Sequence, residues 1–98
     1  MYYQQGDVLI IKVNKIQGKK LSHRVLMEGE ITGHKHEVEK GEVELYEKEG
    51  TLYLRVKSET ATITHPEHHK IIIPQGDYEI KRVREYDHFE EEAREVRD

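Results

Sequence analysis

The sequence has no cysteine and no tryptophan, and it contains only two prolines and one phenylalanine. Without cysteine the chain can form neither disulfides nor thiolate metal sites, and this favours a cytoplasmic protein. No stretch approaches the ~20 consecutive apolar residues of a membrane span. The N-terminus also lacks the basic start and apolar run of a signal peptide. We therefore expect a cytoplasmic protein with no membrane partner.

Several functional classes lack their sequence signals. There is no Gly-x-Ser-x-Gly elbow and no glycine-rich loop opening a helix, so common hydrolase and nucleotide-binding motifs are absent. The net charge of −4 argues against a nucleic-acid partner, which needs basic surface to displace counterions. We interpret the acidic tail over 87–92 and one basic segment as solvated surface. The basic segment contains Lys12, Lys15, Lys19, Lys20 and Arg24.

The chain does have the length and pattern of one small β-rich domain. Its 98 residues suit a single domain, and an apolar fraction of 35% beside a charged fraction of 37% allows only a thin core. Charged residues alternate with valine, isoleucine, leucine and tyrosine, which indicates strands and argues against disorder. The excess of glutamate and lysine is typical of thermophile surfaces.

The predicted fold is all-β, a compact small barrel or sandwich of about seven or eight short strands. Strands are expected over 7–13, 24–27, 31–38, 60–65, 69–73 and 78–84, with a hairpin over 42–57 and turns over 66–67 and 74–77. These elements form one domain over 1–87. The segment 88–98 is predicted to be a short helix or frayed acidic tail, because Phe89, Ala93 and Val96 follow helical spacing. Such a helix would need to pack on the sheet or on a second copy, so a homo-oligomer through this segment is expected.

The register of the hairpin over 42–57 can be predicted from its cross-strand pairs. A two-residue turn at Glu49-Gly50 pairs the aliphatic residues on one face and leaves an aromatic pair and an opposite-charge pair on the other. The predicted pairs are Val43 with Val56, Leu45 with Leu54, Tyr46 with Tyr53, and Glu44 with Arg55. A shift by one residue would expose Leu54, so the register is well specified.

The chain contains seven histidines, and five of them fall into two tight groups. In the first group, the two-residue period of a strand places His34, His36 and Val38 on one face. Three charged residues take the other face, so the histidine face is predicted to point inward. Two parallel imidazoles at this spacing can both reach one metal ion.

The second group lies around the turn that follows the strand over 60–65. His65 is predicted to share the inner face with Ala61 and Ile63. A two-residue turn would pair His65 with His68, whereas a three-residue loop would pair it with His69 and match the apolar residues better. Periodicity alone therefore favours His69 opposite His65.

Three or four neutral imidazole nitrogens at ~2.0–2.1 Å would form a competent site for a divalent transition metal such as Zn, Fe, Ni or Mn. Glu39 or Glu67 could add a carboxylate ligand. Histidines in strands and turns also occur as ordinary hydrogen-bonding groups, so the pattern is open to a structural interpretation. His23 and His88 have no neighbouring histidine in either group and are interpreted as surface residues.

Four segments resemble a family of small uncharacterised proteins of bacteria, archaea and their phages. In that family TGHxH is followed by HxEH, PxGxY and REYD, and the sequence matches these motifs in order over roughly residues 28–87. The matching segments are Thr32-Gly33-His34-Lys35-His36, His65-Pro66-Glu67-His68, Pro74-Gln75-Gly76-Asp77-Tyr78 and Arg84-Glu85-Tyr86-Asp87. The resemblance implies His68 rather than His69. A weaker, cupin-like resemblance rests on His34, His36 and Glu39.

The leading hypothesis is a small β-barrel that binds one divalent transition metal. The sequence identifies neither the metal nor a reaction. The predicted ligands are His34, His36, His65 and His68, with His69, Glu39 and Glu67 as substitutes or additions. One alternative is a non-catalytic interaction module, phage- or defence-related, whose histidines only pack and form hydrogen bonds. Another alternative is a reversible metal carrier or sensor.

Overall fold

Eight β-strands and no helix make up the part of the chain described by the computed structural model, residues 1–28 and 34–83. The all-β prediction is confirmed. The strands are β1 (Tyr2–Gln5), β2 (Val8–Val13), β3 (Lys19–Leu21), β4 (Val25–Glu28), β5 (Lys35–Lys40), β6 (Val43–Lys48), β7 (Thr51–His65) and β8 (His68–Arg82). The predicted C-terminal helix, His88 and the Arg84-Glu85-Tyr86-Asp87 motif lie outside the described residues.

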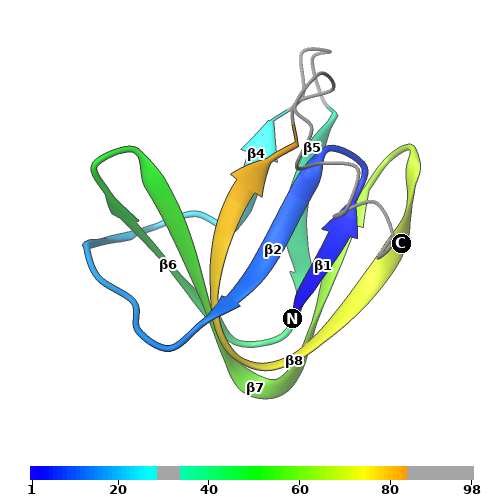
Figure 1. The fold of residues 1–98 in the computed structure, drawn as a ribbon. Coiled ribbons are helices and arrows are strands. Elements are labelled where there is room, and N and C mark those ends of the chain that lie inside the picture. Colours follow the sequence, from blue (N-terminus) through cyan, green and yellow to red (C-terminus); the bar gives the residue numbers. More distant parts are fainter. Residues whose placement is uncertain (29–33, 84–98) are drawn as a thin grey trace.

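The strands form one antiparallel sheet that curls into an open half-barrel (Figure 1). The strand order is β1-β2-β8-β7-β5-β4, while β6 pairs with β7 and β3 pairs with β6. β6 lies beside the first half of β7 and β5 beside its second half. Across the described ranges, no helix is long and apolar enough to cross a membrane.

The long hairpin of β7 and β8 is the centre of this sheet, and both strands bend sharply midway (Figure 1). Val56 pairs with Gly76 and Thr60 pairs with Pro74, so β7 carries extra residues at the bend. We expected a turn over 74–77 that separates two strands, and that expectation is wrong. Pro74 and Gly76 lie within the continuous strand β8, opposite the bulged residues of β7, where neither residue interrupts regular pairing. The Gln75 side chain donates a hydrogen bond to the Lys57 carbonyl (2.7 Å) and so satisfies a bulged backbone group.

The β6–β7 hairpin has the predicted register in every pair named above. Glu49 and Gly50 form its two-residue turn, and both have positive φ angles, 51° and 82°. A turn of this kind follows the right-handed twist of the strands that it joins. The alternation of side chains therefore predicts the register of this hairpin correctly.

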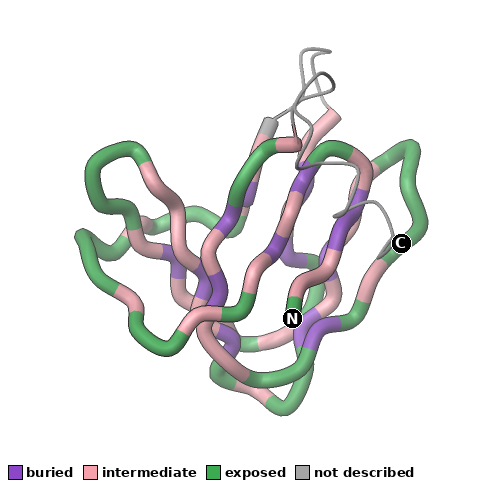
Figure 2. The backbone as a smooth tube through the Cα atoms, in the orientation of Figure 1, coloured by how far each residue is buried: buried purple, intermediate pink, exposed green. Residues whose placement is uncertain are grey.

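The core lies on the concave side of the sheet and follows the predicted inner faces (Figure 2). Val38, Ala61 and Ile63 are buried, as the alternation in β5 and β7 requires. The rest of the core comes from the first half of β7 and from the other strands, namely Val8, Ile10, Leu26, Leu45, Leu54, Val56, Ile73, Tyr78 and Ile80. Burial raises the pKa of Tyr78 to about 12, and its hydroxyl donates a hydrogen bond to the Pro74 carbonyl (2.7 Å).

Two strands were not expected from the sequence. β3 lies in a lysine-rich segment whose composition predicts a loop, and it pairs with the edge of β6. β1 forms a hairpin with β2 through a two-residue Gly6-Asp7 turn, in which Gln5 pairs with Val8. Gly6 has a φ of 58°, a conformation that glycine adopts without steric cost. This hairpin matters because its tip contacts the histidines.

Candidate functional site

Three chain segments meet at one end of the half-barrel: the β1–β2 turn, the start of β5 and the β7–β8 turn (Figure 1). They bring together the rings of His34, His36, His65 and His68, which we call the histidine group. The four residues are those that the sequence analysis predicted as metal ligands.

The rings of the histidine group are in close contact. The His65 ring is central, with its centroid 4.3 Å from that of His36, 4.6 Å from that of His68 and 5.9 Å from that of His34. The centroids of His36 and His68 are 6.0 Å apart. Two imidazoles bound to one tetrahedral ion at ~2.0–2.1 Å would have ring centres roughly 5 Å apart. The spacing of the rings is thus close to that of co-ligands.

The pairing of His65 with His68 resolves the alternatives left open by the sequence. His65 pairs with His68, while Ile63 still pairs with Ile71, because a bulge shifts the register between them. Periodicity favoured His69 because it assumed a regular ladder, and that expectation is wrong. The His68 ring also lies over Gly6, where any side chain at residue 6 would overlap it.

His36 is the buried member of the group, with 1% of its surface exposed. Its Nδ1 lies 2.8 Å from Oε1 of Gln5, and the Gln5 Nε2 donates to the carbonyls of Ile63 (3.0 Å) and His69 (2.8 Å). Because carbonyls only accept, these bonds fix the orientation of the Gln5 amide. Oε1 must therefore accept, and Nδ1 of His36 carries a proton.

The other nitrogen of His36 faces a carboxylate. Its Nε2 lies 3.2 Å from Oδ1 of Asp7. Burial and, to a smaller extent, the neighbouring His65 lower the pKa of His36 to about 4, although Asp7 opposes the shift. His36 is therefore neutral near pH 7, so Nε2 presents a lone pair to the Asp7 carboxylate. A lone pair and a carboxylate at this distance repel each other unless a cation or a proton lies between them.

His65 is held by the turn that follows it. Its Nδ1 accepts a hydrogen bond from the backbone N–H of Glu67 (3.0 Å), so in the neutral ring Nε2 carries the proton. Burial and the neighbouring rings of His68 and His34 lower the pKa of His65. His65 could ligate an ion through Nε2 only after its proton moves and the Glu67 hydrogen bond breaks.

The remaining candidate residues divide between the site and its surroundings. Nδ1 of His34 lies 3.5 Å from the Glu67 carboxylate, so Glu67 is at the rim of the histidine group. Glu39 instead binds Nζ of Lys70 (2.9 Å). His69 contributes only its backbone carbonyl to the bonds described above. His23 is exposed, and its Nδ1 accepts a hydrogen bond from the backbone N–H of Val25.

The ring nitrogens and carboxylate oxygens at this end of the sheet are not gathered around one point. Over residues 1–28 and 34–83, no three histidine, aspartate or glutamate side chains are arranged so that they could hold a metal ion as they stand. The rings in the two closest contacts are tilted against each other, with interplanar angles of 36° and 47°, and the ring of His34 meets that of His65 edge-on at 86°. An ion at this place would therefore require some of the rings to rotate.

Sequence reasoning missed Gln5 and Asp7, which make the most direct contacts with His36. A local signal for them exists. Gly-Asp between two apolar or aromatic runs is a recognised two-residue hairpin turn, and Gly6-Asp7 lies between Tyr2-Tyr3 and the β2 residues. That signal places Asp7 at a hairpin tip, but only the folded sheet brings the tip to His36.

Comparison with known families gives one match. The sequence model of a family described as a domain of unknown function (DUF8820) matches residues 4–83. No curated protein and no solved structure shows significant similarity to the chain. The matched region includes the β1–β2 turn, all four residues of the histidine group and the β7–β8 bend.

Proposed function

The chain belongs to the DUF8820 family, whose description assigns no function, and from its own residues we propose that it binds one divalent transition-metal ion. The proposed ligands are the histidine group together with Asp7. The proposal rests mainly on the distance of 3.2 Å between Nε2 of His36 and Oδ1 of Asp7. Two ligand atoms bound to one ion at ~2.0–2.2 Å are about 3.0–3.5 Å apart, so this pair already has the spacing of co-ligands.

The environment of His36 supports this assignment. A histidine that binds a metal through one ring nitrogen commonly donates its other N–H to a carbonyl, carboxylate or amide oxygen. Gln5 supplies such an oxygen, and its amide is itself held by two backbone carbonyls. The tautomer of His36 is thus set in advance for a ligand at Nε2.

The donor set and its exposure indicate which ions would bind and how. Imidazole nitrogens with one carboxylate suit Zn, Fe, Ni and Mn. The side chains at the rim are open to solvent, since Asp7 is 51% exposed, Glu67 63% and His34 28%. An accessible site of this kind would exchange its ion readily. If one coordination position remained open, the ion would supply Lewis-acid or metal-hydroxide chemistry.

The proposal is tested by titrating Zn²⁺, Ni²⁺ and Mn²⁺ into protein purified without an affinity tag, with calorimetry and elemental analysis as readouts. We expect about one equivalent of Zn²⁺ with a Kd near 1 µM, or ~8 kcal/mol. His36→Ala should abolish uptake, and Asp7→Asn should weaken it by about tenfold, because asparagine keeps the shape but loses the charge. His23→Ala is the matched control and should leave binding unchanged. Stoichiometric uptake by His36→Ala would disprove the ligand assignment.

A second candidate is a module whose histidines only pack and form hydrogen bonds. The bond from the Glu67 N–H to Nδ1 of His65 favours it, because this bond leaves the proton on the nitrogen that a metal would need. The same titration separates the two functions. Under this second function no ion binds at millimolar concentration, and His36→Ala changes only the stability of the fold.

A further inference from the structure

The strand β2 is apolar on both of its faces. Val8 and Ile10 point into the core and are completely buried, whereas Leu9, Ile11 and Val13 point to the convex side of the sheet and are only partly buried. An antiparallel strand with one face in water normally alternates apolar and polar residues. The composition of β2 therefore indicates that a second layer covers the convex side of the sheet at this strand.

No element within residues 1–28 and 34–83 forms that second layer, because all eight strands belong to the one curled sheet (Figure 1). Gln4 pairs with Leu9 and so lies on the same convex face. Gln4 is only 9% exposed, and its Oε1 accepts no hydrogen bond from a described residue. Since buried acceptors are nearly always satisfied, we expect a donor from outside the described residues at this place.

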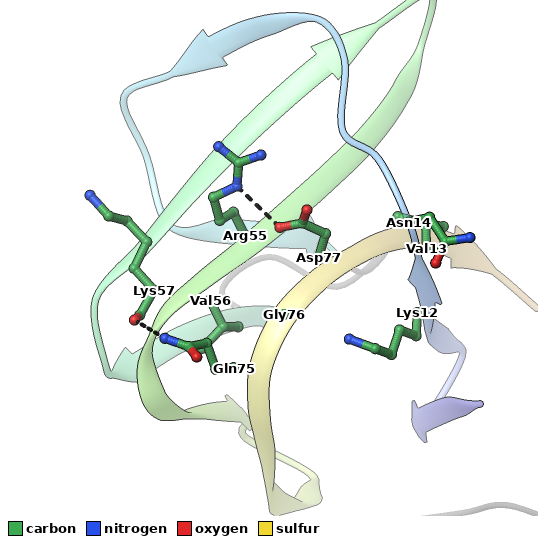
Figure 3. A pocket seen from close by; sticks show the side chains of 9 residues that line it. All are labelled: Lys12, Val13, Asn14, Arg55, Val56, Lys57, Gln75, Gly76 and Asp77. Atoms are coloured by element: carbon green, nitrogen blue, oxygen red, sulfur yellow. Dashed lines mark hydrogen bonds and ion pairs between the residues drawn. The ribbon is translucent and has the colours of Figure 1, made fainter.

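Charged residues limit the apolar part of the convex face to β1 and β2. On the same face of β8, the Lys81 ammonium lies 3.8 Å from the Glu79 carboxylate. Farther along β8, Asp77 binds Arg55 of β7 (3.1 Å; Figure 3). The apolar part is therefore two strands wide, and strands lie ~4.8 Å apart. One helix, about 10 Å in diameter, has the width to cover it.

The described chain ends beside this face. Arg82 at the end of β8 pairs with Val8 of β2, and the backbone N–H of Val83 donates a hydrogen bond to the Asp7 carbonyl (2.8 Å) in the β1–β2 turn. The fifteen residues that follow, 84–98, lie outside the described residues and are called the C-terminal segment below. This segment therefore starts at one end of the β1–β2 hairpin.

The sequence of the C-terminal segment predicts one apolar side. Tyr86, Phe89, Ala93 and Val96 follow one another at intervals of three, four and three residues, which places them on one face of a helix. Seven acidic and three basic residues give the segment a formal charge of −4, which is the whole net charge of the chain. A helix this short is stable only if its apolar side packs on a larger surface.

We propose that the C-terminal segment folds back as a helix over the convex face of its own β1–β2 hairpin, with Phe89 packed on Leu9 and Ile11. The attachment at Val83 gives the segment a local concentration of about 1 mM beside this face, which favours its own sheet over a second copy of the chain. Lys81 lies next to Leu9 and is exposed, so it can pair with acidic residues that flank the apolar side of the helix.

The test is NMR spectroscopy of the full chain, treated with a chelating resin so that the result does not depend on the metal site. Phe89 is the only phenylalanine of the chain, so its ring signals are unique. We expect nuclear Overhauser effects between the Phe89 ring and the methyl groups of Leu9 and Ile11. A mixture of isotope-labelled and unlabelled chains separates contacts within one chain from contacts between two chains.

Three NMR results would overturn the proposal. Contacts that occur only between two chains would assign the convex face to a second copy. Contacts of Phe89 with Leu21 or Leu52 would instead place the segment in the apolar hollow of about 480 Å³ beside β4. Chemical shifts of an unfolded chain over 84–98 would show that the segment covers no part of the sheet.

Variants test the same contact through stability. Phe89→Ala should lower the urea midpoint of unfolding by about 1 M, because it removes a packed aromatic ring. His88→Ala is the matched control, since residue 88 lies off the predicted apolar side, and it should leave the midpoint unchanged. In an Ile11→Thr background, Phe89→Ala should have less than half of its effect, because the two side chains pack against each other. Equal effects of Phe89→Ala in both backgrounds would overturn the proposed contact.

Discussion

Replacing Gln5 with leucine should lower the free energy of unfolding by about 3 kcal/mol. Gln5 is completely buried and makes three side-chain hydrogen bonds, to the carbonyls of Ile63 and His69 and to the ring of His36. Leucine has a similar volume but no polar atom. It would leave the Ile63 carbonyl and the His36 N–H buried without partners, at about 1–2 kcal/mol each, whereas the His69 carbonyl belongs to an exposed residue and can bind water.

Urea unfolding followed by circular dichroism measures this loss. For a domain of this size the dependence on urea is about 1–1.5 kcal/mol per molar, so the midpoint should fall by roughly 2–3 M. Gln4→Leu is the matched control. Gln4 is also buried, but it donates one hydrogen bond, to the Gly6 carbonyl, and its Oε1 has no partner in the described part of the chain. Its replacement should cost less than about 1 kcal/mol. Equal losses in the two variants would refute the assigned role of Gln5.

Two further predictions concern acid and the β6–β7 turn. The folded state lowers the pKa of His36 from 6.5 to about 4, so the unfolded chain binds a proton that the folded chain does not. Stability should be complete above about pH 6.5 and fall by at most ~3 kcal/mol as the pH drops to 4; urea midpoints that stay constant between pH 7 and 4.5 would contradict this. Glu49→Asn should raise the melting temperature by a few degrees, since asparagine tolerates the positive φ of 51° better. Gly50→Ala should lower the melting temperature, and a rise would show that the turn differs from the one described.

Local alternation in the sequence predicted the parts of the fold that depend on neighbouring residues. The β6–β7 register follows from cross-strand pairs that are close in the chain, and the inward direction of His36 and Ile63 follows from alternation in single strands. Such arguments fail at bulges, because one extra residue reverses the faces. This is why His69 was favoured over His68, whereas Pro74 and Gly76 were taken for a turn because their residue types are common in turns.

The histidine group was only partly predictable for the same reason. The sequence identified the four rings, and their contacts follow the predicted inner faces. The contacts of Gln5 and Asp7 with His36 span about thirty residues of chain and depend on how far the sheet curls. The pattern of residues within one strand does not predict how far the sheet curls. The contacts of Gln5 and Asp7 with His36 therefore became apparent only in the folded structure.

The β7–β8 hairpin determines how the protein is expected to unfold. The first half of β7 pairs with β6 and its second half pairs with β5, while β8 pairs with β7 along both halves. Both ends of the sheet therefore share the same two strands. Neither end could be cut out as a unit that folds by itself. Amide protons at the two ends should therefore exchange with solvent through a single global opening, and fragments that divide the chain within this hairpin should remain unstructured.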